Sequence, residues 1–253
     1  MSCKVMGIVN VTPDSFSDGG QFFRPEEAVR RAKNLIAEGA DIIDLGGEST
    51  RPGATPIGWE EEWARIEPVL VGLTSSVSRL KSFQISVDTY HPETASKAIA
   101  AGAHVINCVY AEPIPEMLKL LGGNDVELVM PAKCFETLAS AGRRDADGTV
   151  ERLYLDPMIG FNTTREEDVE LLRSIPELAK KGRVLVGASR KRIVKKLIGE
   201  KSAVGKNVGG NVAIAVWAAL RGASVVRVHD VKETVQALRV VESLTSKAPT
   251  SNV

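Results

Sequence analysis

Polar residues follow a series of short apolar runs in this sequence, and their types could bind a flat polar ligand. Asp88, Asn107 and Asp156 each end such a run. Carboxylate oxygens accept paired N–H bonds, and a side-chain amide both donates and accepts. The set therefore suits a heterocycle that presents several N–H donors, such as the edge of an aminopyrimidine.

Cationic side chains occur at similar places, after other apolar runs. Arg51, Lys191, Arg227 and His229 are positively charged or can become so. Arginine binds phosphate oxygens with two parallel bonds, so this group suits a phosphate or a diphosphate. Asn10, with aspartates nearby, could help to hold Mg²⁺, because this ion prefers oxygen ligands and often bridges a protein to substrate phosphates.

Arg227 and His229 alternate with two valines, so a strand would direct both polar side chains to one face. The functional interpretation is that both side chains meet a phosphate group. The alternative is a structural ion pair between Arg227 and either Asp44 or Asp230. Spacing in the sequence leaves both interpretations open.

The segment MGIVNVTPDSFSDGG, residues 6–20, shows the pattern of an apolar run with a polar end most clearly. The apolar run ends at Asn10, and a polar loop with two glycines follows. A plain connector needs only a few residues, whereas this loop carries Asp14, Phe16 and Asp18. We expect the loop to form one lip of a cleft and to close over a bound ligand.

These polar residues need a scaffold that brings the ends of many strands together. Apolar, β-branched runs of about five to seven residues alternate with longer amphipathic stretches, which indicates a parallel sheet covered by helices. The predicted strands are 5–11, 41–47, 83–89, 104–109, 126–130, 152–157, 183–189 and 225–230. The predicted helices lie near 26–38, 58–80, 92–101, 113–121, 165–181, 190–221 in two pieces, and 231–246.

About eight such units predict a (β/α)8 TIM barrel, formed as a single domain by residues 1–253. In that fold the carboxyl ends of all strands meet at one face, where barrel enzymes place their chemistry. A doubly wound open sheet is the alternative. The crossover between the fifth and sixth strands, from Pro131 to Arg152, is shortened and has room for one short helix, around Lys133 to Ala141.

Composition excludes several classes of protein. The net charge is zero and the pI is about 6.9, so no electrostatic attraction to nucleic acid or to a membrane is expected. No apolar run approaches the roughly 18 residues of a membrane span, and the first residues do not resemble a signal peptide. The three cysteines and three histidines show no zinc-binding spacing. Reduced thiols suit a cytoplasmic protein.

Several stretches of the sequence strongly resemble dihydropteroate synthases. These stretches are GIVNVTPDSFSDGG, DLGGESTRPGA, ISVDT, INCV, LDPMIGF, VGASRK and VRVHDVKET, in order between about Lys4 and Ser243. The resemblance implies a TIM barrel that is usually a homodimer. It also implies a reaction that joins 6-hydroxymethyl-7,8-dihydropterin diphosphate to p-aminobenzoate and releases diphosphate, with Mg²⁺ present.

The resemblance also implies roles for individual residues on the pterin side. Met130 and Phe161 would pack against the pterin ring. The polar residues that would bind the pterin are Asp88, Asn107, Asp156 and Lys191.

On the other side of the site, the resemblance implies that Asn10, Arg227 and His229 hold the metal-bound diphosphate. Thr50 and Arg51 would close near that group. Ser189 would help to seat p-aminobenzoate, and the loop with Phe16 would fold over it. The residues with a catalytic role would be Asp88, Lys191, Arg227 and His229.

Three departures from the family pattern lie on adjacent units. The usual Asn-Asp after the fourth strand reads Asn107–Cys108, and the usual glycine-rich turn with a lysine reads Met-Ile-Gly-Phe-Asn-Thr at 158–163. The usual His-Met after the fifth strand is replaced at 131–134, and the stretch that follows is shortened. We predict an active synthase, with two alternatives: a methyltransferase-like paralogue that binds methylated folates, or a non-catalytic pterin-binding protein.

Overall fold

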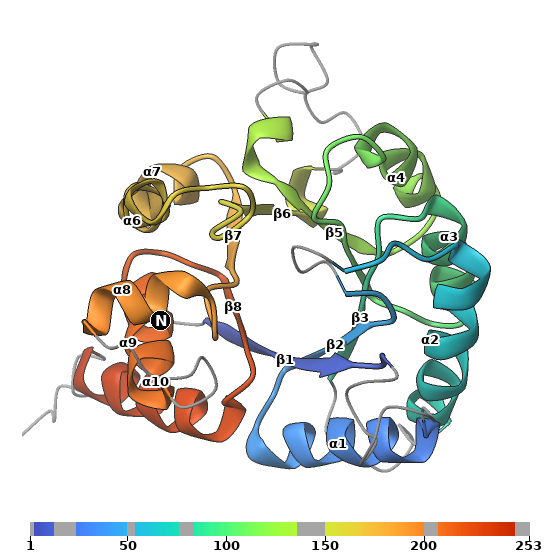
Figure 1. Ribbon diagram of the computed structural model, residues 1–253, viewed down its shortest axis with the longest axis horizontal. Helices are drawn as coiled ribbons and strands as arrows, with labels where there is room; N and C mark the ends of the chain where they lie inside the picture. The colour runs from blue at the N-terminus through green and yellow to red at the C-terminus, as the bar shows by residue number, and fades with distance from the viewer. Residues whose placement is uncertain are drawn as a thin grey trace, which may run out of the picture.

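The chain forms a closed barrel of eight parallel strands that follow one another around the barrel in chain order (Figure 1). The structure, a computed structural model, describes residues 3–12, 24–49, 54–75, 83–135, 150–199 and 207–245. Strand β1 (Lys4–Asn10) pairs with β2 (Ile42–Gly46) and with β8 (Val225–Val228), which closes the sheet. The predicted (β/α)8 barrel is thereby confirmed, and the open sheet is excluded.

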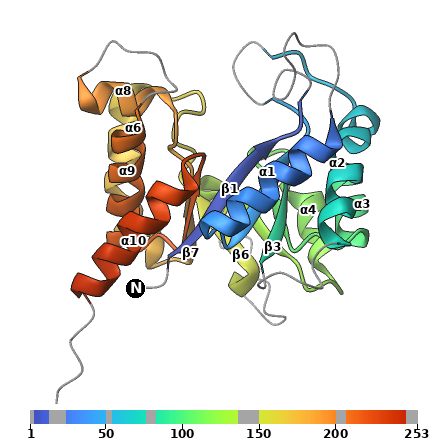
Figure 2. The same ribbon diagram turned by 90° about the horizontal axis from the view of Figure 1, so that it is seen from below.

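The other strands lie within the predicted apolar runs and are shorter than those runs, except β5, which is shifted by one residue relative to the predicted run 126–130. They are β3 (Gln84–Asp88), β4 (Val105–Asn107), β5 (Glu127–Pro131), β6 (Leu153–Asp156) and β7 (Arg183–Val186). Figure 2 shows β1 rising from the end of the barrel that holds the N-terminus toward the opposite end. Because all strands are parallel, their carboxyl ends lie together at that opposite end.

The helices surround the barrel, as the amphipathic stretches predict (Figure 1). They are α1 (Pro25–Glu38), α2 (Trp59–Thr74), α3 (Pro92–Ala100), α4 (Ile114–Leu121), α6 (Arg165–Arg173), α7 (Ile175–Ala179), α8 (Arg192–Ile198), α9 (Val208–Leu220) and α10 (Val231–Thr245). Helix α1 begins at Pro25, which fits the first turn, and ends before Gly39 at a φ of 106°. Among the described residues, no helix is long and apolar enough to cross a membrane.

Two predicted helices differ in their boundaries. Helix α2 ends at Thr74, and residues 76–80 of its predicted stretch lie outside the described residues. The stretch 165–181 forms two helices instead of one, because Pro176 lacks the N–H that would continue the ladder of α6 through Ser174. In the shortened crossover, residues 132–135 are helical and a 3₁₀ turn (Val150–Arg152) leads into β6, while 136–149 lie outside the described residues.

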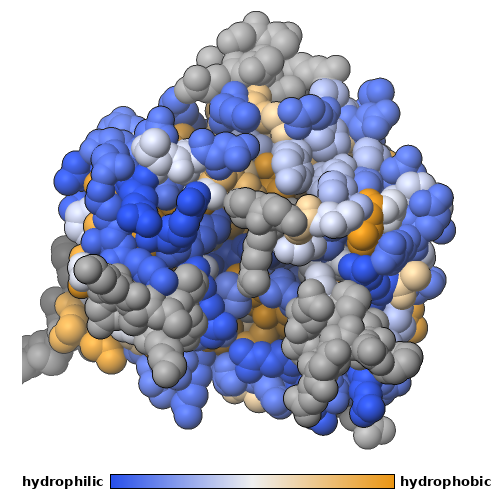
Figure 3. All heavy atoms as spheres, in the orientation of Figure 1, coloured by the Kyte–Doolittle hydropathy of each residue, from blue (hydrophilic) through white to orange (hydrophobic). Residues whose placement is uncertain are grey.

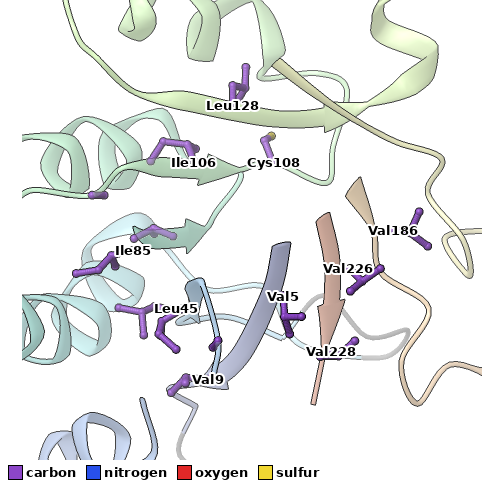
Figure 4. Close-up of a cluster of buried hydrophobic side chains, with 14 of the residues drawn as sticks. Val5, Val9, Leu45, Ile85, Ile106, Cys108, Leu128, Val186, Val226 and Val228 are labelled. Atoms are coloured by element: carbon purple, nitrogen blue, oxygen red, sulfur yellow. The ribbon is translucent and has the colours of Figure 1, made fainter. Parts of the chain in front are cut away.

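Strand residues alternate between two apolar clusters, as the period of two requires. The outer cluster lies between the strands and the helices, and Figure 4 shows part of it on successive strands. The inner cluster fills the barrel and consists of Met6, Ile42, Val105, Val129, Tyr154, Leu185 and Val225. All seven side chains are buried, so the barrel is a packed core and no channel runs through it.

Candidate active site

A polar layer lies directly above the inner apolar cluster, toward the carboxyl ends of the strands. Each even-numbered strand contributes one residue to it, two positions after that strand's residue in the apolar cluster. The four residues are Asp44, Asn107, Asp156 and Arg227. The period of two places each of them inside the barrel, so the apolar residue below fixes where the polar residue points.

Arg227 joins two carboxylates in this layer and just above it. Its Nε donates to Oδ2 of Asp44 at 2.6 Å, and its Nη2 donates to Oδ2 of Asp88 at 2.6 Å. The ion pair with Asp44, one of the alternatives left open by the sequence, is therefore present, whereas Asp230 pairs with Arg190 at 2.7 Å. Burial raises the pKa of Asp88 to about 7, and the charge of Asp44 adds to this rise, although Arg227 opposes it.

Asp44 belongs to this site, although the sequence predicts it only as a possible ion-pair partner of Arg227. Its side chain is fully buried and accepts bonds from Ser86 Oγ at 2.5 Å and from Asn107 Nδ2 at 3.3 Å, in addition to Arg227. The available signal is an aspartate in the middle of the otherwise apolar strand IIDLG, two positions after Ile42. A charged residue in such a place must be paired, so its partners mark the interior of the barrel.

Asn107 keeps one unused acceptor in the layer. Its amide nitrogen is bonded to Asp44, and the residue is 1% exposed. Its Oδ1 is buried and has no hydrogen-bond partner among the described residues. Buried polar atoms are usually satisfied, so an orphan acceptor at the open end of a barrel is suited to a ligand donor.

Lys191, at the N-terminus of α8, reaches across to the turn that follows β6. Its Nζ donates to the carbonyl oxygen of Ile159 at 2.6 Å and lies 4.3 Å from the centre of the Phe161 ring. Burial lowers the pKa of Lys191 to about 8, and the charge of Asp156 is the largest influence that opposes this shift. Burial in turn raises the pKa of Asp156, whose Oδ1 accepts the N–H of Met158 at 2.7 Å. A carboxylate and an ammonium group thus share this side of the barrel.

Three further predicted residues stand at the carboxyl ends of neighbouring strands. Ser189 Oγ lies 3.1 Å from Nδ1 of His229 and accepts the backbone N–H of that histidine at 3.3 Å. Asn10 ends β1 beside Gly46, where a Cβ would lie 3.8 Å from Asn10 Oδ1 and 3.8 Å from Asp88 Cβ. Glycine therefore leaves the space between the two polar side chains open.

Together these residues form a largely buried polar hollow with distinct sides. Acceptor oxygens and the Lys191 ammonium group lie on the side of β4 and β6, and the guanidinium and the histidine lie on the side of β8. On this face of the molecule, hydrophilic residues cover much of the surface around the barrel (Figure 3). Such a hollow can bind a polar heterocycle on one side and an anionic group on the other.

Comparison with known proteins identifies the family. The sequence pattern of the pterin binding enzyme family matches residues 6–151 and 133–229. The dihydropteroate synthase of Escherichia coli (strain K12) is 38% identical over 264 residues, covering 96% of this chain and 92% of that protein. This chain belongs to the dihydropteroate synthase family. The synthase of Staphylococcus haemolyticus is 35% identical over 95% of this chain and 94% of that protein.

Solved structures of the family share the fold over nearly the whole chain. The Xanthomonas albilineans dihydropteroate synthase with 4-aminobenzoic acid is 40% identical, with a TM-score of 0.85. The match covers 98% of this chain and 95% of that chain. The same enzyme in complex with 7,8-dihydropteroate gives 36% identity and a TM-score of 0.82, and the match covers 98% of this chain and 95% of that chain.

Most residues implied by the resemblance to this family come together at one end of the barrel. The structure joins Asp88 to Arg227 and joins Lys191 to the turn that carries Phe161. Met130 is the exception. It is fully buried in the outer cluster, because Val129 occupies the inward position of β5, so Met130 does not line the barrel interior. The other implied residues, Phe16, Thr50 and Arg51, lie outside the described residues.

The departure from the family pattern at Cys108 also falls on the outer side of the sheet. Cys108 packs in the outer cluster with Ile106 and Leu128 (Figure 4). Burial raises the pKa of its thiol to about 12, so the thiol stays neutral. Replacing a carboxylate at this position therefore removes no acceptor from the barrel interior.

Proposed function

We propose that this chain condenses 6-hydroxymethyl-7,8-dihydropterin diphosphate with p-aminobenzoate, forming 7,8-dihydropteroate and diphosphate in folate biosynthesis. The observation that carries the proposal is the polar layer of the even-numbered strands, with Asn107 and Asp156 on one side and Arg227 on the other. Membership of the dihydropteroate synthase family supplies the reaction.

Asp156 and Asn107 are the proposed recognition groups for the amino group and ring N–H donors of the pterin. Both are buried, and the unpaired Oδ1 of Asn107 supports this assignment. Lys191 would donate to an acceptor on the same ring, and Phe161 would pack beside it. A buried carboxylate that accepts two N–H bonds fixes the orientation of the ring as well as its position.

Arg227, His229 and Asn10 are proposed to bind the diphosphate. In a dissociative mechanism the C–O bond of the substrate breaks first, and its electron pair leaves with the diphosphate. The electron-rich pterin stabilises the resulting CH₂ cation, the amine of p-aminobenzoate forms the new C–N bond, and the ammonium proton passes to solvent. Charge grows on the diphosphate as it leaves, so cations fixed nearby stabilise the transition state.

The residues at this end of the barrel fit Mg²⁺ that arrives with the diphosphate. The described residues include no group of three or more His, Cys, Asp or Glu side chains that could bind a metal. A single amide oxygen from Asn10 suits an ion that keeps several waters and binds mainly through substrate phosphates. When bound, Mg²⁺ would neutralise charge on the leaving diphosphate. We expect chelation with EDTA to abolish product formation and added Mg²⁺ to restore it.

The acceptor is proposed to bind at the mouth of the hollow, near Ser189. The hydroxyl of this residue is held by His229, which supports a fixed position for it. Phe16 would complete this subsite, whereas Thr50 and Arg51 would close near the diphosphate, as the resemblance implies. The Xanthomonas albilineans structure with 4-aminobenzoic acid supports the choice of acceptor.

We propose that the protein is a cytoplasmic homodimer. Helices α9 and α10 carry large exposed apolar side chains, Trp217, Leu220, Val240 and Leu244, which a second copy could cover. Light scattering during size-exclusion chromatography tests this proposal, and a mass of one chain across micromolar concentrations would contradict it.

A non-catalytic pterin-binding protein remains the second candidate, because the turn at 158–163 and the shortened crossover depart from the family pattern. One experiment separates the two: calorimetry with the pterin diphosphate, run beside a chromatographic assay for 7,8-dihydropteroate. Binding together with product supports the synthase. Binding without product, at saturating p-aminobenzoate and Mg²⁺, would support the non-catalytic candidate.

A further inference from the structure

The turn after β6, residues 157–163, has an unusual backbone. Three alternate residues adopt left-handed conformations: Met158 at φ 64°, Gly160 at 78° and Asn162 at 54°. Only one of the three is glycine, so two side chains are held in a region that L-residues seldom occupy. Such a conformation persists only when surrounding contacts determine it.

Asp168 supplies the contacts that hold this turn from the helix side. Its carboxylate lies in the first half of α6 and is 2% exposed. Its Oδ1 accepts the backbone N–H of Gly160 at 2.7 Å and the hydroxyl of Thr163 at 2.6 Å. Thr163 Oγ1 also accepts the N–H of Gly160, at 3.2 Å. Three groups therefore meet at the centre of the turn.

The opposite side of the turn faces the site. The carbonyl oxygen of Ile159, next to Gly160, accepts a hydrogen bond from Nζ of Lys191. The ring of Phe161 lies beside the same ammonium group. A Cβ on Gly160 would lie only 3.0 Å from Lys191 Cδ, so the backbone and the lysine are in close contact. A change in the turn must therefore move Lys191 or Phe161.

We propose that Asp168 is a positioning residue: it holds the 157–163 turn in the shape that places Lys191 and Phe161 against the pterin. This inference rests on the proposed function, because it assigns the same hollow to a pterin. Asp168 contacts the turn from behind. Family membership does not assign this role, and the turn departs from the family pattern here.

The test compares pterin binding and kinetics in three variants. Asp168→Ala removes the acceptor, so the affinity for the pterin diphosphate should fall about tenfold or more and its KM should rise accordingly. The KM for p-aminobenzoate should stay within about twofold. Asp168→Asn keeps an acceptor oxygen and should restore the affinity to within about threefold of wild type. Thr163→Val removes the hydroxyl that bridges Asp168 and Gly160. This variant replaces Asp168→Ala in the comparison if Asp168→Ala does not fold.

Glu167→Ala is the matched control. Glu167 precedes Asp168 on the same helix, is exposed, and bonds the N–H of Thr164 in a capping box. Its loss should lower the melting temperature through the cap while the pterin affinity stays unchanged. Equal pterin affinities for Asp168→Ala and Glu167→Ala would overturn this inference alone. A wild-type protein that binds no pterin would overturn the proposed function as well.

Hydrogen exchange gives a readout that needs no ligand. The Gly160 N–H is bonded to Asp168, so Asp168→Ala should speed exchange in peptides that cover 157–163. Glu167→Ala should leave that exchange rate unchanged. Unchanged exchange in a folded Asp168→Ala protein would show that Asp168 does not hold the turn.

Discussion

The barrel contains two polar layers, and they differ in how their side chains are used. The lower layer consists of the first residues of the odd-numbered strands: Lys4, Gln84, Glu127 and Arg183. These side chains bond to one another in sequence around the barrel, at 2.8, 3.1 and 2.6 Å. The guanidinium of the last residue also stacks on the Tyr154 ring, with 4.0 Å to its centre. This layer seals the amino end of the barrel.

The upper layer has similar residue types in a different arrangement. Arg227, like Arg183, bonds a carboxylate at 2.6 Å, so an ion pair inside the barrel does not by itself mark a functional site. Among the described residues, orphan polar atoms occur in both layers: Oδ1 of Asn107 in the upper one, and Nε and Nη2 of Arg183 in the lower one. The difference is that the upper groups stand at the open end of the barrel, where a ligand can reach them. Burial also moves the pKa values of Asp88 and Lys191 toward neutrality there.

The largest expected effect comes from replacing Arg227. Arg227→Ala should lower kcat/KM for the pterin diphosphate roughly 10²-fold or more, which is typical of losing one transition-state donor. Affinity for a pterin without the diphosphate should change little. Because two carboxylates lose their partner, stability should also fall by roughly 3–5 kcal/mol, so melting curves must show a folded protein. Near-normal activity in folded Arg227→Ala would remove the diphosphate assignment.

Asp156→Asn should have the next largest effect. The change keeps the shape but replaces one acceptor with a donor, and a buried mismatch of this kind costs about 1–3 kcal/mol. Calorimetry should show pterin affinity reduced about tenfold. Glu127→Gln in the lower layer makes the same chemical change and should leave pterin affinity within error. An equal loss in both variants would erase the distinction between the layers.

The pH dependence of kcat/KM should follow two groups beside the upper layer, Asp88 and Lys191. The pKa of Asp88 is raised to about 7, so this group gains a proton and loses its charge as the pH falls below 7. The pKa of Lys191 is lowered to about 8, so the ammonium charge is lost as the pH rises above 8. We expect a bell-shaped profile of kcat/KM against pH, with its maximum between these two pKa values. Near each pKa, kcat/KM should have fallen about twofold. A flat profile from pH 6 to 9 would contradict it.

Arg183→Ala should have the smallest effect on catalysis. The substitution breaks the bond to Glu127 and the stacking on Tyr154, so the melting temperature should fall by several degrees. Values of kcat and both KM should stay within about twofold of wild type, and the pH profile should keep both limbs. A kcat/KM loss that approaches that of Arg227→Ala would show that the lower layer contributes to the site.

The sequence predicts the barrel and most of the site because both depend on the same short-range rule. Strand residues alternate, so an apolar residue two positions earlier is enough to direct Asp156 or Arg227 into the lumen. For Met130 the resemblance implies a contact with the pterin ring, but the alternation along β5 directs this side chain outward. The rule also cannot reveal partners across the barrel. The bonds from Arg227 to Asp44 and Asp88 depend on closure, which no local pattern encodes.

The turn at 157–163 shows the other limit of sequence reasoning. Its residues read as a departure from a glycine-rich pattern, which suggests damage to the pterin side. The structure instead shows a tightly held turn, because Asp168 satisfies the N–H of Gly160 from a helix that follows in the chain. A hydrogen bond from a backbone N–H to a side chain eight positions later, as between Gly160 and Asp168, leaves no periodic pattern in the sequence.

The pairing of β1 with β8 has a consequence for the synthesis of this protein. Lys4 faces Val225 and Gly7 faces Val228, so the first strand to leave the ribosome waits for the last. Until then one edge of β1 is open to pairing with other chains. Ribosome-bound chains can be stalled with β8 inside or outside the exit tunnel. Limited proteolysis should show that β1 is protected only when β8 is outside the tunnel. An unfinished chain would therefore be a client for chaperones long before it could bind a pterin.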